Sequence, residues 1–137
     1  MPASGVGSSM GDLTENFSLR EFRCKDGTDV PPELIDNVTF LAKNLQVLRQ
    51  LIGKPVKVIS GYRSPAYNKK CGGTKKSQHM QARAADLKVS GMSSDELHEP
   101  IANAIKNDLL APGGLGWYPS FVHYDTRGRN ARWKGSK

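Results

Sequence analysis

Residues 31–60 read PPELIDNVTFLAKNLQVLRQLIGKPVKVIS, and this stretch indicates a mixed fold because it joins a helical pattern directly to a strand. Its apolar residues recur at intervals of four and three positions, which is the spacing of one buried face of an amphipathic helix. Gly53 and Pro55 predict the end of that helix. The next segment, 56–60 (VKVIS), alternates and is β-branched, so it predicts a strand.

The rest of the chain predicts further strands and one more helix. Ser93, with Glu96 three residues later, predicts a capping box at the start of a helix that runs to about residue 109. Pro100 lies inside that pattern and predicts a late start or a kink. Short strands are predicted at 84–89, 115–118 and 121–125. Because strands and helices do not alternate regularly, we predict an α+β fold with a small antiparallel sheet and flanking helices.

The chain has 137 residues, which is enough for one sizeable core. We expect the Gly/Ser-rich segment 1–11 to be either a flexible leader or a remnant of cloning, and 12–137 to form a single domain. No apolar run is long enough to span a membrane, and no secretory signal peptide is visible. With 37% hydrophobic residues, 24% charged residues and two cysteines, the composition excludes membrane-embedded, collagen-like and disulfide-scaffold proteins.

The formal net charge of +7 is concentrated in the second half of the chain. Residues 1–53 contain five Lys/Arg and seven Asp/Glu, whereas residues 54–137 contain fifteen and six. The excess forms two clusters, within 69–76 and 127–137. A basic surface attracts anionic polymers, but charge alone leaves nucleic acid, membrane surfaces and other polyanions as alternatives.

Two segments carry residues suited to metal chemistry. Residues 77–86 read SQHMQARAAD, and residues 121–127 read FVHYDTR. In a strand, side chains two residues apart share a face, so His123 and Asp125 are predicted to lie on the same side of the sheet. Two imidazoles and one carboxylate are a common ligand set for catalytic zinc, whereas a single histidine near a strand end is usually a surface or hydrogen-bonded core residue.

From Asn16 to Trp133 the sequence resembles the D-alanyl-D-alanine carboxypeptidase-like zinc peptidases, the VanY/VanX-like and phage-endolysin-type enzymes that cut peptidoglycan peptides. The resemblance rests on FSLREFRCKDG, on SGYRSPAYN, on the pattern S-x-H-x-x-G-x-A-x-D and on GWYPSFVHYDTRG followed by RW. It implies a Hedgehog/DD-peptidase-like fold and a peptidoglycan peptide substrate at the bacterial cell wall. It also implies one zinc ion per chain, held by His79, Asp86 and His123.

The same resemblance implies roles for four further residues. Arg63 matches the arginine that faces the scissile carbonyl or its developing oxyanion, a task that suits a permanently charged guanidinium. The alternative for Arg63 is a surface salt bridge. The family also places aromatic residues at the rim of the cleft, and Ser77, Tyr62 and Trp117 are expected to contact the substrate.

The sequence departs from the family pattern at two positions. Ala82 stands where the family usually has glycine, which matters if the backbone there needs a positive φ. Ser120 stands where many relatives have a glutamate that acts as the general base. Asp125 is then the candidate base that takes a proton from water and returns it to the leaving amine. Its alternative role is to orient an imidazole from behind the metal.

Several questions stay open at this stage. A non-catalytic module that binds the cell wall is the main alternative function, and nucleic-acid binding has only the basic clusters in its favour. Cys24 and Cys71 leave a disulfide and free thiols as alternatives, and without a visible signal peptide we expect free thiols. His98, beside two glutamates, is expected to be solvated. We expect a monomer that does not insert into membranes, from a phage, a prophage or a bacterium.

Overall fold

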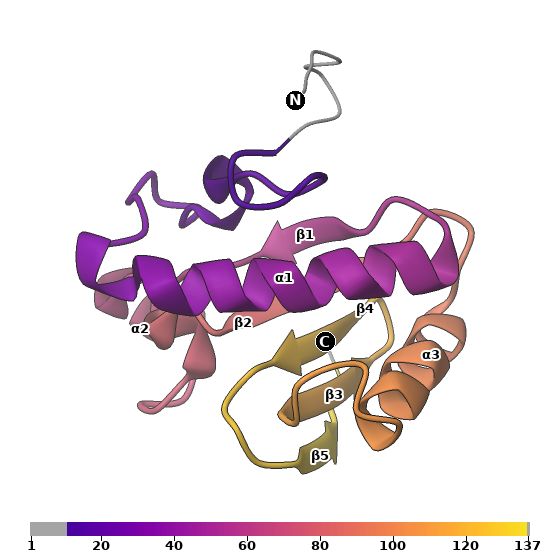
Figure 1. Ribbon diagram of the computed structural model, residues 1–137. Coiled ribbons are helices and arrows are strands. Elements are labelled where there is room, and N and C mark those ends of the chain that lie inside the picture. The colour runs from indigo at the N-terminus through magenta and orange to yellow at the C-terminus, as the bar shows by residue number, and fades with distance from the viewer. Residues whose placement is uncertain (1–10, 137) are drawn as a thin grey trace.

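The computed structural model describes residues 11–136, which fold around one five-stranded sheet in the order β1-β2-β4-β3-β5 (Figure 1). The predicted leader 1–11 lies outside the described residues except for Gly11. The strands are β1 (Lys57–Ser60), β2 (Ala84–Lys88), β3 (Gly114–Tyr118), β4 (Phe121–Asp125) and β5 (Ala131–Lys134). The helices are α1 (Ile35–Ile52), α2 (Pro65–Lys70) and α3 (Ser94–Lys106), with short 3-10 turns η2 (Leu19–Phe22), η3 (Pro32–Leu34) and η4 (Gln78–Gln81).

Both predicted helices are present, but the prediction of a late start for α3 is wrong. The helix begins at Ser94 because Ser93 and Glu96 form the expected capping box in front of it. The Ser93 hydroxyl accepts from the Glu96 amide at 3.1 Å, and the Glu96 carboxylate accepts from the Ser93 amide at 2.8 Å. Pro100 lies inside the helix, since its fixed φ is helical and its cost is one backbone hydrogen bond.

The α+β class is confirmed, and the sheet is antiparallel as predicted in all its strand pairs but one. The strand β5, which sequence reasoning missed, pairs in parallel with β3. The parallel pairing follows from the chain path. Asp125 at the end of β4 lies beside Gly114 at the start of β3, and the loop 126–130 carries the chain past β3, so that β5 starts opposite Gly114.

The sheet has a core face and a functional face because side chains alternate along each strand. On β2 and β4, Leu87, Val122 and Tyr124 belong to the hydrophobic core. Asp86, next to Leu87 on β2, and His123, between Val122 and Tyr124 on β4, point to the opposite face. The alternation in 122–125 therefore places Val122 and Tyr124 on one side of the sheet and His123 and Asp125 on the other.

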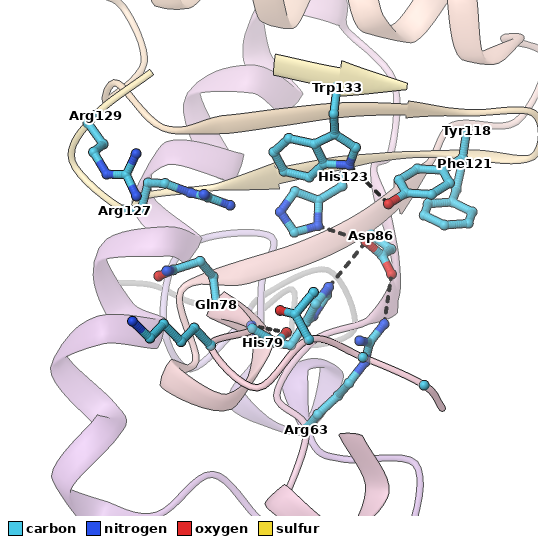
Figure 2. A pocket seen from close by; sticks show the side chains of 15 residues that line it. Arg63, Gln78, His79, Asp86, Tyr118, Phe121, His123, Arg127, Arg129 and Trp133 are labelled. Atoms are coloured by element: carbon cyan, nitrogen blue, oxygen red, sulfur yellow. Dashed lines mark hydrogen bonds and ion pairs between the residues drawn. The ribbon is translucent and has the colours of Figure 1, made fainter. Parts of the chain in front are cut away.

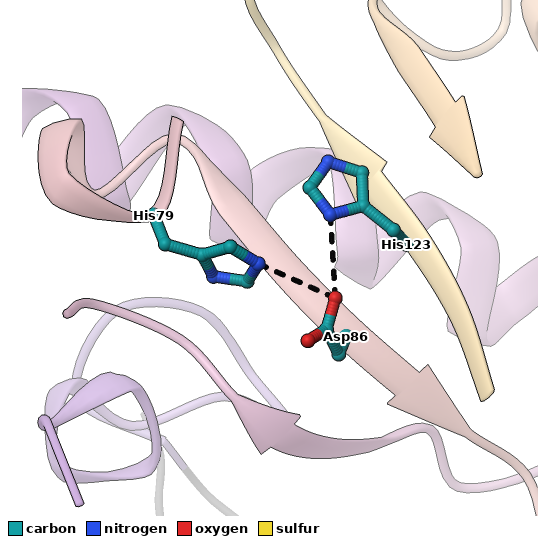
Figure 3. A group of neighbouring side chains, drawn as sticks. All are labelled: His79, Asp86 and His123. Carbon is teal, nitrogen blue, oxygen red and sulfur yellow. Dashed lines mark hydrogen bonds and ion pairs between the residues drawn. The ribbon is translucent and has the colours of Figure 1, made fainter. Parts of the chain in front are cut away.

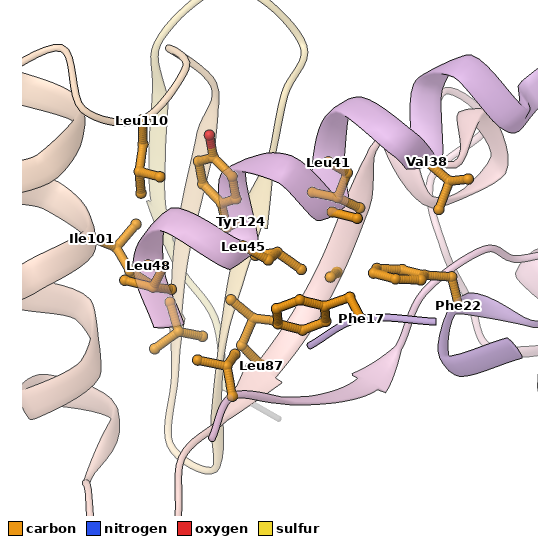
Figure 4. Close-up of a cluster of buried hydrophobic side chains, with 14 of the residues drawn as sticks. Phe17, Phe22, Val38, Leu41, Leu45, Leu48, Leu87, Ile101, Leu110 and Tyr124 are labelled. Atoms are coloured by element: carbon orange, nitrogen blue, oxygen red, sulfur yellow. The ribbon is translucent and has the colours of Figure 1, made fainter. Parts of the chain in front are cut away.

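Helix α1 covers the core face of the sheet (Figures 1 and 4). Its residues Val38, Leu41, Leu45 and Leu48 are fully buried, as the 4–3 spacing predicts. Each such side chain contributes roughly 1.5–3 kcal/mol by leaving water. This packing fixes the sheet that carries the polar residues on its other face. Within residues 11–136, no helix combines the length and the apolar character that crossing a membrane requires.

Candidate active site

His79, Asp86 and His123 converge on the functional face of the sheet (Figure 3), and we call them the metal triad. Asp86 on β2 and His123 on β4 are direct partners in the sheet register. His123 Nδ1 lies 3.2 Å from Asp86 Oδ1, and His79 Nε2 lies 3.3 Å from the same oxygen. The structure thus brings together the three residues that the family resemblance implies as zinc ligands.

The spacing of the metal triad fits a zinc ion. Its three donor atoms lie within 4.8 Å of one another. In a tetrahedral site with metal–ligand distances near 2.0–2.1 Å, neighbouring ligand atoms are about 3.3 Å apart, which is close to the two contacts at Asp86. The three residues are between 3% and 7% exposed, so the donors are already sheltered from bulk water. Two imidazoles and a carboxylate leave a fourth position for water or substrate.

His79 is oriented by the backbone. Its ring Nδ1 donates to the Gly61 carbonyl oxygen at 2.7 Å, which leaves the lone pair on Nε2 to face Asp86. The Ser77 hydroxyl accepts from the His79 amide at 3.2 Å and so caps the η4 turn. Burial lowers the pKa of His79, despite the opposing effect of Asp86. The imidazole is therefore held in the neutral form that binds a metal.

The η4 turn ends on a strained residue. Ala82 has φ 55° and ψ 32°, which is the left-handed conformation. Glycine adopts this conformation without cost, whereas other residues pay roughly 1–2 kcal/mol. The substitution of the usual glycine by Ala82 is therefore not neutral for the backbone.

His123 is oriented by a carboxylate instead of the backbone. Its ring Nε2 donates to Asp125 Oδ2 at 2.7 Å, and Nδ1 is left to face Asp86. Burial lowers the pKa of His123, but hydrogen bonds to Asp125 and Asp86 outweigh it and the net shift is upward. Burial raises the pKa of Asp86, but the close approach of the His123 and His79 rings outweighs this and holds that pKa below its ordinary range.

Asp125 has no capacity left for a further proton donor. Its Oδ1 accepts from the Gly114 amide at 2.8 Å and from the Arg127 amide and Nε at 3.1 and 2.9 Å. Its Oδ2 accepts from Arg127 Nη2 and His123 Nε2, both at 2.7 Å. These donors already fill the roughly four acceptor sites of a carboxylate. Burial raises the pKa of Asp125, but the bonds to His123 and Arg127 outweigh it and the net shift is strongly downward.

Asp125 also lies away from the cleft. The side chain is fully buried, and it is not among the residues that line the cavity at the metal triad. A general base must reach the water that it deprotonates. Of the two roles that the sequence left open, the contacts of Asp125 therefore favour orientation of His123.

Arg63 lies at the edge of the metal triad. Its Nη2 is 3.5 Å from Asp86 Oδ2, and its Nη1 donates to Asn68 Oδ1 at 3.4 Å. Its side chain is 14% exposed, and its buried Nε has no hydrogen-bond partner among the described residues. Arg63 is thus not in a surface salt bridge, and it retains N–H groups that can donate into the cavity.

The metal triad opens into a cavity of about 600 Å³ (Figure 2). Tyr118 and Phe121 stack with ring centroids 4.4 Å apart, and Trp133 donates from its indole to the Tyr118 hydroxyl at 3.0 Å. The Trp133 ring centroid is 4.9 Å from that of His123. Polar residues Lys76, Ser77, Gln78, Arg127 and Arg129 also line this cavity.

The structure places two of the predicted substrate-binding residues outside the cavity. Tyr62 is 5% exposed and belongs to the hydrophobic core. Trp117 donates to Asp95 on α3 at 2.7 Å and lies under the Lys134 ammonium group, 4.7 Å from the ring centroid. Strand alternation explains this, because Trp117 shares the core face with Leu115, whereas Tyr118 points to the functional face.

The family resemblance led us to expect aromatic residues at the rim of the cleft, and the cavity is lined by Tyr118, Phe121 and Trp133, of which sequence reasoning had not singled out Phe121. The residue that makes room for this rim is Gly116, which lies opposite both His123 and Trp133 in the strand register. A Cβ at Gly116 would overlap the Trp133 indole, so the absence of a side chain there lets the indole lie against the sheet.

The remaining candidates lie outside the metal triad. His98 is half-buried on α3 and does not line the cavity. Cys24 and Cys71 are free thiols in the structure. Cys24 is buried near Ser64, and Cys71 follows α2.

Comparison with known proteins agrees with the site. The family model described as Peptidase M15 matches residues 13–125. The peptidoglycan L,D-endopeptidase MepK of Escherichia coli K12 is 32% identical over 120 residues, covering 81% of this chain and 59% of the relative. The zinc D-Ala-D-Ala carboxypeptidase of Streptomyces albus G is 36% identical over 73 residues, covering 53% of this chain and 29% of the relative. The chain thus spans less than two thirds of the length of these curated relatives.

Proposed function

The chain belongs to the peptidase M15 family, and we propose that it is a zinc-dependent peptidase that hydrolyses peptide bonds in peptidoglycan stem peptides or cross-links at the cell wall. The convergence of the metal triad in a cavity carries the proposal. MepK and the Streptomyces carboxypeptidase are named for peptidoglycan endopeptidase and D-Ala-D-Ala carboxypeptidase activities. We expect one zinc ion per chain and a monomer, and we expect no nucleic-acid ligand.

Each residue of the site has a proposed task. His79, Asp86 and His123 would hold the zinc ion through Nε2, a carboxylate oxygen and Nδ1. Zinc in such a site supplies Lewis-acid activation of water and of the peptide carbonyl. Arg63 donates its free N–H groups to the carbonyl oxygen as negative charge develops there. Ser77 positions His79 through its hydrogen bond to the histidine amide and borders the substrate.

For Asp125 we propose a positioning role. Its carboxylate holds the His123 ring in the tautomer that presents Nδ1, and it holds Arg127 through two side-chain hydrogen bonds. Asp125 therefore couples a metal ligand to a residue that lines the cavity.

One observation favours a second candidate function. Among the described residues that line the cavity, Asp86 is the only carboxylate, so no further acidic group is in place as a general base. The lack of a second carboxylate in the cavity is expected of a cell-wall-binding module that keeps the fold and the zinc site. Such a module binds peptidoglycan without cutting it.

Mass spectrometry of muropeptides after digestion with zinc-loaded protein separates the two candidates, with zinc quantified in the same sample. A peptidase releases new peptide ends, and His79→Ala or a chelator abolishes the release. His98→Ala is the matched control, because His98 lies outside the cavity. Wall binding with an unchanged muropeptide profile would reject the peptidase and favour the binding module.

A further inference from the structure

The cavity at the metal triad carries different chemistry at its two ends. Arg127, Arg129 and Gln78 lie on one side of His123, and the stacked rings of Tyr118 and Phe121 lie on the other (Figure 2). Lys76 lines the cavity as well. We call Lys76, Gln78, Arg127 and Arg129 the cationic end of the cavity.

The positive charge at the cationic end is not compensated by the protein. Within residues 11–136, neither Lys76 nor Arg129 forms an ion pair. Arg127 is paired with Asp125, which fixes its guanidinium, and its Nη1 has no partner among the described residues. The Asp125 carboxylate is buried behind His123 and the Asp86 carboxylate is paired with Arg63, so neither is in an ion pair with Lys76 or Arg129.

Gln78 adds a hydrogen-bond acceptor at the same end. Its Oε1 is buried and has no hydrogen-bond partner among the described residues. A buried acceptor that stays unpaired is unfavourable, so a ligand with an N–H group gains by filling it. The cationic end therefore suits a ligand that offers a carboxylate and an N–H donor close together.

We propose that the cationic end is a subsite for a free carboxylate of the stem peptide next to the cleaved bond. Arg129 and Lys76 bind the carboxylate, Arg127 donates from Nη1, and Gln78 accepts from the neighbouring amide or ammonium N–H. The aromatic rim takes the aliphatic part of the substrate on the other side of the metal triad. This assignment rests on the proposed function, because it names the substrate class of the same cleft.

Isothermal titration calorimetry with a matched peptide series tests the subsite without requiring cleavage. The probe is L-Ala-γ-D-Glu-meso-diaminopimelate-D-Ala-D-Ala, and in three analogues one free carboxylate at a time is replaced by a carboxamide. The titrations use metal-free protein at 0.15 M salt, where interactions beyond about 8 Å are screened. One of the three amidations is expected to weaken binding by about tenfold, which is the scale of a lost charge-assisted hydrogen bond. The other two amidations remove the same charge elsewhere in the peptide and so measure the effect of peptide charge alone on affinity.

Variants link the effect to the residues. The double variant Lys76→Ala/Arg129→Ala is expected to bind the full-acid peptide as weakly as the sensitive amide. The control Lys88→Ala/Lys106→Ala removes the same charge from exposed positions outside the cavity and is expected to leave binding unchanged. Three outcomes would overturn the subsite. All four peptides could bind equally within twofold, none could bind measurably, or the two double variants could lose the same affinity.

The same peptides distinguish the subsite from the hydrolysis itself. Cleavage is followed separately with zinc-loaded protein. Selective binding without cleavage rejects the peptidase and keeps the subsite, whereas cleavage without carboxylate selectivity rejects the subsite alone. The identity of the sensitive carboxylate also tells whether the cut lies next to the C-terminus of the stem peptide or within it.

Discussion

His79 and His123 contact the same oxygen of Asp86, but the chain holds the two rings in different ways. His79 is fixed by a neutral backbone carbonyl at Gly61, whereas His123 is fixed by the Asp125 carboxylate. The first arrangement leaves the imidazole with a lowered pKa, and the second raises it. The candidate metal site thus combines one histidine that is bonded to the backbone with one that is bonded to a network of charged side chains reaching the cavity.

The largest effects are expected when either ring is removed. His79→Ala and His123→Ala each lose zinc, and peptide release falls by about 10³-fold or more, because activation of water by the metal is lost. Atomic absorption and muropeptide analysis measure these losses.

Stability of the metal-free protein separates the two variants. His123→Ala removes a charge-assisted hydrogen bond to the fully buried Asp125 and is expected to cost about 1 kcal/mol more than His79→Ala, which removes a hydrogen bond to a neutral carbonyl. Urea unfolding in chelator gives both values. Equal losses would mean that the carboxylate network does not distinguish His123 from His79.

The next largest effect is expected from Asp125→Asn, which removes the charge that holds His123. Zinc affinity is expected to fall by about 10–100-fold, the usual cost of losing a carboxylate behind a ligating histidine. Competition with a chromophoric chelator measures it, and Asp95→Asn on α3 is the matched control. If zinc affinity stays unchanged while turnover at saturating zinc is lost, Asp125 acts as the general base and the positioning role is wrong.

That His123 and Asp125 lie on the same face of the sheet could be predicted from the sequence, because the prediction uses only residues that are close together in the chain. Period-two alternation in 121–125 put His123 and Asp125 together, and the structure joins them by a 2.7 Å hydrogen bond. The capping pair at Ser93 and Glu96 likewise depends on residues three positions apart. Such features need no knowledge of the tertiary fold.

The rim of the cavity depends on pairing between distant strands, which a single sequence does not display. The strand β5 (Ala131–Lys134) alternates apolar and charged residues but is only four residues long, and its place is set by pairing with β3. Trp133 reaches His123 only because Gly116 opposite it has no side chain. The position of Trp117 outside the cavity has a related reason, since alternation along β3 turns its side chain toward the core face.

A pH titration of the metal-free protein sharpens the contrast between the two rings. The pKa of His79 is lowered, mainly by burial, so the stability it contributes is present above its unfolded pKa and is lost as the pH falls below it. The pKa of His123 is raised by its carboxylates against the effect of burial, so its contribution is present at low pH and is lost as the pH rises through the folded value.

Unfolding free energies between pH 5 and 8 are therefore expected to change in opposite ways in two variants. Relative to wild type, His79→Gln loses less stability on acidification, and His123→Gln loses less on alkalinisation. Equilibrium urea titrations in chelator provide the values. Parallel pH profiles for the two variants would contradict the opposite pKa shifts.

The smallest effect is expected at Ala82, which ends the turn that carries His79. Ala82→Gly relieves the left-handed backbone, worth roughly 1–2 kcal/mol, and loses a buried methyl group, worth about 0.8 kcal/mol. The net result is a gain of less than about 1 kcal/mol in urea unfolding. Ala85→Gly on β2 makes the same chemical change at a fully buried residue without a positive φ, and it is expected to destabilise. If both variants lose the same stability, the backbone at Ala82 is not strained. The turn that carries His79 would then be no more strained than the strand β2 that carries Asp86.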